Sequence, residues 1–370
     1  YLNTNKRSVE LDFSNETDRA ALIDLVADSD VLVESLRPGA LDRLGLGYET
    51  LREINPKLVM TSITNFGQDG PYRDWEGTDL TIWAMGGAMN TTGHPDHEPL
   101  KLAGHAPTYH LGYVAALATM VSLFGTDVRG TGEHLDVNFF RSAMHSIDLR
   151  LAFLMGYEYT GFIRPRERTA LGLGSGTREC ADGFFNTTVV PLRFPDFARM
   201  IDTEHLLEIP EWATPAARME PERYEEIEAY VVPWMLERTK KEVRALHQEF
   251  GVLGGPLNTI ADLFEDEQFA RREFFHDVEH PTTGAIKYPG YHFNFRTEET
   301  RPSRKRAPLL GEHSQEVMAE VDHHRPRNGS KRTVWTTPLM TSERSPLLPN
   351  EGRLPLEGIR IIDMTVVWAG

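Results

Sequence analysis

Apolar positions along the first half of the chain follow helical and strand spacing in turn. Residues 16–28 carry apolar side chains at helical spacing, whereas the short runs 30–35 and 58–63 have the composition of strands. Strand–helix–strand order with short connections favours a parallel sheet with right-handed crossovers. Two longer apolar segments, 79–89 and 108–124, predict helices. The second is nearly free of charge, so we expect it to lie centrally in the fold.

The pattern changes in the second half of the chain. Residues 164–176 are rich in Arg and Gly and predict a loop, and residues 182–190 predict a turn followed by a strand. The acidic, amphipathic region 220–250 predicts helix that is interrupted near Pro233. Residues 251–256, which include three glycines and a proline, predict a turn.

These patterns predict the organisation of the chain. We expect a large lobe at 1–175, a small lobe at 176–300 and a return to the large lobe at 301–321. Residues 322–353 carry Pro, Ser, Asn and charge without periodicity and predict a linker. Residues 354–370 include the β-branched run of a buried strand, but no crossover helix follows it. Since there is also no initiator Met, we expect a first unit that lacks its first strands and a second unit that is cut after its first strand.

Charge and hydropathy exclude two classes of protein. The chain has 39 Lys and Arg against 55 Asp and Glu, a net charge of −16, whereas nucleic-acid-binding proteins usually carry a basic surface. The longest uncharged apolar run, 111–125, is shorter than the roughly 20 residues that span a bilayer. Neither a nucleic-acid nor a membrane partner is therefore expected.

Cysteine and histidine indicate neither disulfides nor a metal site. The single cysteine, Cys180, has no internal partner, which fits a reducing cytoplasm. His94, His97, His105 and His110 are close in sequence, but their spacing does not place two on one helical face with a carboxylate. We therefore expect a cytoplasmic protein without a bound metal.

Several longer motifs together resemble one family. They are N-x-N-K-R-S-V-x-L-D at 3–12, D-V-L-V-E-S-L-R-P-G-x-L-x-R-L-G at 30–45, N-P-K-L-V at 55–59, G-Q-x-G-P-Y at 67–72, G-x-G-x-x-L-D-V at 130–137, G-V-x-x-G-P at 251–256 and A-P-x-L-G-E-H-S at 307–314. In this order they resemble the class III CoA-transferases, the CaiB/BaiF family, over residues 1–320. Residues 355–363 resemble the opening of a family member. The chain is thus similar to the first copy of a tandem member, such as the dimethylsulfoniopropionate CoA-transferase/lyase group, truncated at both ends.

The resemblance implies a fold and a reaction. The fold would be α/β, with a Rossmann-like large lobe built on a parallel sheet and a smaller α+β lobe, in the interlocked-dimer type of this family. The reaction would move CoA between an acyl-CoA and a carboxylic acid. In the family an Asp attacks the thioester to give a mixed anhydride, and CoA then forms an enzyme thioester that the acceptor opens. Acyl-CoA and carboxylates would be the substrates, with no metal.

The same resemblance puts an arginine where the family has its nucleophile. Counting from the G-x-G motif, the Asp position falls on Arg141, and a guanidinium cannot accept an acyl group. Asp136, Asp148 and Glu133 are nearby carboxylates that could substitute, although each is also an ordinary surface acid. In the related α-methylacyl-CoA racemases the paired His would fall on Thr78, which is no general base near neutral pH. We therefore expect this copy to support a second copy in the same chain, which carries the Asp. The expected protein partner is that second copy or a homodimer partner. The alternatives are a non-catalytic CoA-binding scaffold and a racemase-like or lyase relative.

The CoA-contacting positions of the family match this chain more fully. By resemblance they include Leu11, Ser14, Ser35, Leu36, Arg37, Arg43 and Asp79. Arg37 and Arg43 suit a diphosphate or a 3′-phosphate, because a guanidinium forms charge-assisted pairs with phosphate oxygens. The alternative for both is a solvated surface ion pair. Residues 172–176 correspond either to the glycine loop that closes over the intermediate or to an ordinary surface loop.

Overall fold

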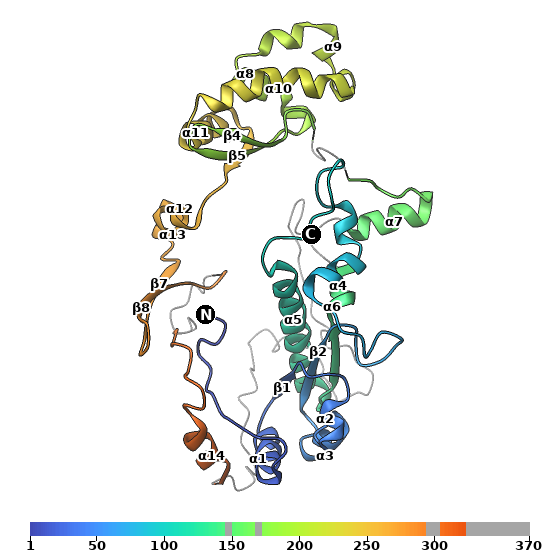
Figure 1. Cartoon of the computed structure of the whole chain (residues 1–370), viewed down its shortest axis with the longest axis vertical. Coiled ribbons are helices and arrows are strands. Elements are labelled where there is room, and N and C mark those ends of the chain that lie inside the picture. The colour runs from blue at the N-terminus through green and yellow to red at the C-terminus, as the bar shows by residue number, and fades with distance from the viewer. Residues whose placement is uncertain (145–149, 167–171, 294–303, 323–370) are drawn as a thin grey trace, which may run out of the picture. The chain divides into compact units, whose positions relative to one another are not determined.

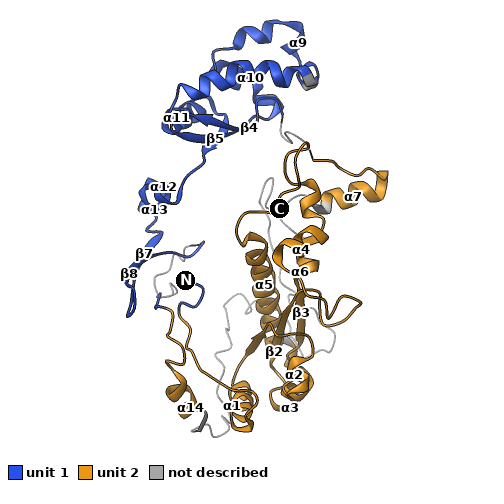
Figure 2. Cartoon of the chain, viewed as in Figure 1, with its two compact units in different colours: residues 1–4, 167–306 blue, residues 5–166, 307–370 orange. Residues whose placement is uncertain are grey.

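The computed structural model describes residues 1–144, 150–166, 172–293 and 304–322. The chain divides into two compact units, which Figure 2 shows in different colours. One unit contains residues 5–166 and 307–370, and the other contains residues 1–4 and 167–306. The linker predicted at 322–353 and the strand predicted within 354–370 lie outside the described residues, apart from residue 322.

The unit that contains residues 5–166 is built on a parallel sheet. Its strands are β1 (Val31–Glu34), β2 (Val59–Thr64) and β3 (His134–Asn138), in the order β1-β2-β3. Val31 pairs with Val59, and Met60 pairs with His134. The parallel sheet predicted from the alternation of strands and helices is therefore confirmed.

Helices pack on both faces of this sheet (Figure 1). The helices α1 (Glu16–Ala27), α2 (Ala40–Arg43) and α3 (Tyr48–Ile54) bury Val26, Leu41 and Leu51 in a core that also contains Met60 of β2. On the other face lie α4 (Asp79–Met85), the 3-10 turn η1 (Ala88–Thr91), α5 (Ala106–Arg129) and α6 (Phe139–Met144). Their core includes Ile82, Leu111 and Ala143, with Ile63 of β2 packed against it. Because side chains alternate along a strand, β2 supplies both cores.

Polar contacts complete the packing of α5 on the central strand. The buried hydroxyls of Thr61 in β2 and Thr119 in α5 lie 2.7 Å apart, and Thr119 Oγ1 also donates to the Ala115 carbonyl. Each buried hydroxyl therefore has a partner, as a buried polar group requires. The helices α7 (Arg150–Thr160) and α14 (Ser314–Asp322) are the remaining described helices of this unit. No described helix is apolar over a long enough stretch to cross a bilayer.

The other unit has an antiparallel sheet covered by helices. Its strands are β4 (Gly176–Cys180), β5 (Gly183–Thr188) and β6 (Leu253–Pro256). The longer helices are α8 (Phe194–Met200), α10 (Pro221–Leu236) and α11 (Lys240–Phe250), with the short α9 (Pro210–Ala213) and the 3-10 turns η2 (Pro191–Arg193), η3 (Glu204–Glu208) and η4 (Ala217–Met219) between them. One core joins these elements and includes Phe185, Phe197 and Met235. The helices α12 (Ile260–Glu265) and α13 (Glu267–Arg271) and the hairpin β7 (Phe275–His280) and β8 (Gly284–Pro289) follow.

Two local predictions for this unit were wrong. Pro233 lies inside α10 and does not interrupt it, because Trp234 and Met235 are buried in the core and hold the last turn. The break comes later, where Thr239 caps α11 through a capping box with Glu242. The predicted turn at 251–256 is in part the strand β6, because Leu253 and its neighbours find a partner in β5.

Candidate functional site

The parallel sheet directs three loops toward one edge. Because β1, β2 and β3 run in the same direction, the segments that follow Glu34, Thr64 and Asn138 leave the sheet at the same side. In open parallel sheets, ligands bind outside the carboxyl ends of the strands. Most of the residues that the sequence singled out lie on or next to these three segments.

A cavity opens where β1 ends. It has a volume of about 240 Å³ and is lined by Phe13, Leu22, Leu32, Val33, Glu34, Ser35, Leu36, Leu41 and Leu46. Phe13 belongs to the segment that contains Leu11 and Ser14, so this segment and the Ser35–Leu36 pair meet at one cavity. Ser14 itself is exposed, and its hydroxyl donates to Asp12 Oδ1 (2.7 Å), which lowers the pKa of that carboxyl. Of the predicted CoA-contacting residues, the structure thus brings Ser35 and Leu36 to the cavity directly.

The two predicted phosphate-binding arginines lie just beyond the cavity. Arg37 is exposed and forms an ion pair with Glu76, whose side chain is also exposed. Arg43 is the last residue of α2, is exposed, and forms no ion pair with another described residue. Exposed ion pairs contribute little to stability, so neither arginine is required to hold the fold together.

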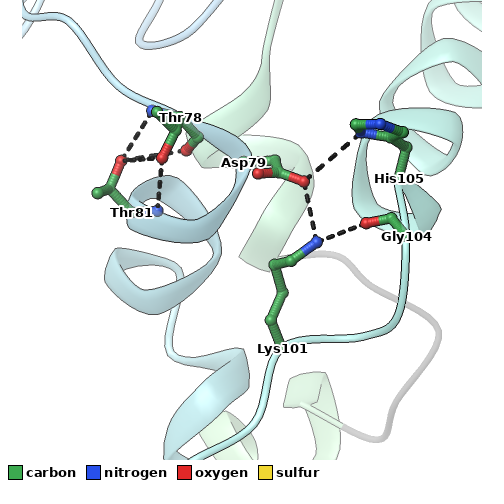
Figure 3. Close-up of polar contacts among 6 residues, drawn as sticks. All are labelled: Thr78, Asp79, Thr81, Lys101, Gly104 and His105. Atoms are coloured by element: carbon green, nitrogen blue, oxygen red, sulfur yellow. Dashed lines mark hydrogen bonds and ion pairs between the residues drawn. The ribbon is translucent and has the colours of Figure 1, made fainter.

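Asp79 sits at the start of α4 in a polar cluster (Figure 3). Thr78 caps the helix through reciprocal bonds with Thr81: its hydroxyl accepts from the Thr81 amide, and its amide donates to Thr81 Oγ1 (2.9 Å). Lys101 Nζ donates to Asp79 Oδ2 (2.9 Å) and to the Gly104 carbonyl (2.5 Å). The hydrogen bond from Lys101 lowers the pKa of Asp79, and His105 Nδ1 lies 3.8 Å from the same oxygen. Asp79 is therefore held ionised by a fixed cation.

Sequence reasoning missed Lys101 altogether. The sequence suggests His105 only as a possible metal ligand, and it contains no motif that pairs residues 79 and 101. The two meet because the loop between η1 and α5 returns to the N-terminus of α4, which is a property of the folded chain. Among the described residues, no group of three His, Cys, Asp or Glu side chains could hold a metal ion.

The two described carboxylates near the predicted nucleophile position, Asp136 and Glu133, each have hydrogen-bond partners. Asp136 Oδ2 accepts a hydrogen bond from the Gln68 amide (2.9 Å), and it lies 3.2 Å from the point where a Cβ on Gly67 would be. Gly67 has a φ of +105°, so only glycine fits this turn without strain. Glu133 accepts from Ser122 Oγ (2.5 Å) and from Arg129 Nη2 (2.7 Å). Asp148 lies outside the described residues.

Arg141 is exposed in the first turn of α6. Its amide donates to Asn138 Oδ1 (2.8 Å), so Asn138 caps the helix that presents the arginine to solvent. Thr78, at the racemase histidine position, is engaged as the cap of α4. Gly172 and Gly174 adopt positive φ in the other unit, and Gly176 begins β4.

Comparisons with known proteins agree on one family. The family model described as CoA-transferase family III matches residues 1–314. Subunit BbsE of succinyl-CoA:(R)-benzylsuccinate CoA-transferase from Thauera aromatica is 32% identical over 335 residues, covering 87% of this chain and 80% of that protein. A formyl-CoA:oxalate CoA-transferase from Streptomyces avermitilis is 30% identical over 332 residues, covering 85% and 80%. The crystal structure of a CAIB/BAIF family protein from Brucella suis superposes with a TM-score of 0.75 at 30% identity, covering 86% of this chain and 82% of that one. The chain therefore belongs to CoA-transferase family III.

Proposed function

We propose that this protein is a CoA-transferase that moves CoA between an acyl-CoA and a carboxylic acid. Family membership supports the proposal, as do the CoA-transferase names of the relatives. The structural observation that supports the proposal most directly is the cavity at the end of β1, which Phe13, Ser35 and Leu36 line together. Two segments that the family uses for CoA thus line one hollow at the edge of the sheet where ligands of open α/β folds bind.

Within this site each predicted residue has a role that suits its chemistry. Ser35 and Leu36 line the cavity and contact the ligand there, with Leu11 and Ser14 beside Phe13. Arg37 and Arg43 pair with phosphate oxygens of the nucleotide end. Asp79, held ionised by Lys101, accepts hydrogen bonds from the ligand.

The reaction requires a carboxylate that acts as the nucleophile, and we propose that this unit does not supply it. In the reaction a carboxylate attacks the thioester carbonyl, CoA thiolate leaves, and a mixed anhydride forms. The thiolate then attacks the enzyme carbonyl, releases the donor acid and leaves an enzyme thioester. The acceptor carboxylate opens this thioester to a second mixed anhydride and releases CoA thiolate. The thiolate attacks the acceptor carbonyl of that anhydride, which gives the new acyl-CoA and restores the enzyme carboxylate. We assign the nucleophile position of this unit to Arg141, which cannot take part. Asp79 and Asp136 are engaged as described above, so the nucleophile is expected in a second copy of the fold.

The exposed face of α5 supports the second copy. Tyr109, Tyr113, Leu117, Met120 and Phe124 follow one another at helical spacing, and all five are exposed. Such side chains, when about half exposed, each leave roughly 100 Å² open to water, or about 500 Å² in all. Two copies that pair through this face would bury about 1,000 Å², which is the lower limit of a specific interface. We infer that a second copy of this fold packs on this face of α5, within the same chain or in a homodimer. The word subunit in the name of the BbsE relative is consistent with this arrangement.

The α5 face is tested by adding charge to it. The double variant Leu117→Lys, Met120→Lys is compared with Ile54→Lys, which alters an exposed apolar residue on α3. In the full-length protein, the double variant should lower the mass measured by light scattering, or lower the melting temperature by several degrees if both copies share one chain. The control should change neither. An unchanged mass and melting temperature for the double variant would exclude this face as the interface.

The proposed reaction is tested by trapping its intermediate. The full-length protein is incubated with succinyl-CoA or formyl-CoA, and the acyl-enzyme is located by mass spectrometry after trapping with hydroxylamine. An adduct on an Asp of the second copy, with none in residues 1–320, is the expected result. An adduct on Glu133, Asp136 or Asp148 would show that this unit is catalytic by itself. Binding of CoA without any exchange would instead establish a non-catalytic CoA-binding module.

A further inference from the structure

Two segments at the carboxyl edge of the sheet face each other. One follows β1 and contains residues 37–43, and the other follows β2 and contains residues 72–76. The ion pair between Arg37 and Glu76 links them at one point. A second point of approach lies between Arg73 and Gly39, and neither Arg73 nor its neighbours belong to the CoA residues assigned above.

Two guanidinium groups, those of Arg73 and Arg43, approach the side of Gly39 where a side chain would be. A Cβ built on Gly39 would lie 2.8 Å from Arg73 Nη2 and 3.5 Å from Arg43 Nη1. Gly39 also has a φ of +73°, so glycine is the residue this backbone favours. Since both nitrogen atoms lie close to one point, the two cations are neighbours and repel each other unless an anion lies between them.

Arg73 is held in place on its far side. Its Nε donates to the Gln68 carbonyl (2.8 Å), and its Nη1 lies 3.2 Å from Asp74 Oδ1. These contacts leave Nη2 directed toward Gly39. Asp42 is the other acid here, with Oδ2 4.0 Å from the same Cβ point, so the pair is partly neutralised in the free protein. A guanidinium fixed at one end and open at the other is suited to charge-assisted bonds with a phosphate.

An exposed aromatic stack adjoins Arg73 on both sides in sequence. The rings of Tyr72 and Trp75 are stacked, with centroids 4.1 Å apart and planes inclined by 29°. Phe66 supports both rings edge-on, at 5.9 Å and 6.2 Å. Trp75 is nevertheless 53% exposed, so one large π surface stays open to solvent beside the arginine pair. Purine bases stack on such surfaces.

We propose that Arg73, together with Arg43, binds a phosphate of the nucleotide end of CoA, and that the Tyr72–Trp75 stack packs against its adenine. This inference rests on the proposed function, because it takes CoA as the ligand. Glu76 has a defined part in the site: its carboxylate occupies Arg37 in the free protein and must yield to an incoming phosphate. Arg73 and Trp75 are thus binding residues that add recognition of the nucleotide to the cavity at the end of β1.

The test separates the parts of the ligand. Calorimetric titrations of the full-length protein use CoA, dephospho-CoA, 3′,5′-ADP, 5′-AMP, adenosine and pantetheine. The variants are Arg73→Gln, Arg73→Lys, Trp75→Ala, Trp75→Phe and Glu76→Gln. Arg52→Gln, on α3 and paired with Glu49, and Tyr157→Ala, on α7 and similarly exposed, are the matched controls. Unchanged melting temperatures identify the variants that fold, and the two conservative variants remain informative if the others do not.

Each change predicts a distinct loss. Arg73→Gln should weaken the binding of 3′,5′-ADP and of CoA about 10-fold or more, and it should leave the affinities for adenosine and pantetheine unchanged. Arg73→Lys should retain part of the lost affinity. Trp75→Ala should weaken the binding of adenosine and of CoA about 5-fold or more, whereas Trp75→Phe should retain the affinity for both. Glu76→Gln should strengthen the binding of CoA, because it frees Arg37. The controls should bind every probe as the unaltered protein does.

The outcomes distinguish this inference from the proposed function. Unchanged binding of 3′,5′-ADP and adenosine by both variants would overturn the inference, even if acyl-CoA exchange by the unaltered protein confirms a transferase. The inference would also be overturned by equal losses for pantetheine and 3′,5′-ADP, or by 5′-AMP binding that matches 3′,5′-ADP and exceeds CoA. The selective losses without any CoA exchange would support the nucleotide site and contradict the proposed reaction.

Discussion

Acidification should destabilise the unit that contains His247, and the structure sets the size of the effect. His247 in α11 is fully buried. Its Nδ1 lies 2.8 Å from the Val243 carbonyl and donates to it, because a carbonyl oxygen can only accept. In the neutral ring Nε2 therefore carries no proton, and it accepts a hydrogen bond from the Thr187 hydroxyl (3.1 Å). Phe185 packs on the ring, with centroids 4.7 Å apart. No described acid pairs with this ring, and burial lowers the pKa of His247.

The direction of the effect follows from which state binds the proton. Because the pKa is lower in the folded protein, the unfolded chain is protonated first as the pH falls. The stability due to neutral His247 is therefore complete above about pH 6.5 and is lost progressively below it. If the folded ring stays neutral, the loss reaches about 1.4 kcal/mol at pH 5.5. A loss of this size lowers the melting temperature of a unit of this length by about 3 to 6 °C.

The assay compares the unaltered protein with two variants between pH 7.5 and 5.5. His247→Gln removes the titrating group, and His205→Gln removes an exposed histidine of the same unit. Hydrogen exchange of peptides from β5 and α11 reports the stability of this unit separately from the rest of the chain. In the unaltered protein and in His205→Gln, these peptides should lose protection from exchange on acidification. In His247→Gln their protection should be lower at pH 7.5 and should fall less on acidification. Parallel pH profiles for all three proteins would refute the reasoning.

Two further predictions concern the other unit. Lys101→Met should raise the pKa of Asp79 toward its ordinary value, near 4, because the cation that stabilises the carboxylate is gone; NMR titration of the carboxyl carbon measures this, and a pKa that stays low would assign the shift to another group. Leu51→Ala should lower the free energy of unfolding by about 2 to 5 kcal/mol, because this side chain is fully buried between α3 and the sheet. Urea unfolding measures the loss. As the control, Leu36→Ala, at an exposed position, should lower the free energy of unfolding by less than about 0.5 kcal/mol. Equal losses for the two variants would contradict the core described here.

The local sequence determined much of the secondary structure. The helix predicted at 16–28 is α1, and the strands predicted at 30–35 and 58–63 are β1 and β2. These elements could be predicted because one face of each repeats its apolar side chains at the period of the element. The helix predicted at 108–124 is α5, which extends further at both ends, from Ala106 to Arg129. The family could also be recognised, because its motifs recur in order along the chain.

Only the tertiary structure decided where long-range partners meet. Leu253 and its neighbours form a strand because β5 offers an edge to pair with, and α10 continues past Pro233 because its last turn is buried. The same applies to the site. Lys101 meets Asp79 across 22 positions of sequence, and Arg73 approaches Gly39 from the segment that follows β2. Periodicity reports which face of an element is buried, whereas loop contacts depend on the path of the folded backbone, which no short stretch of sequence contains.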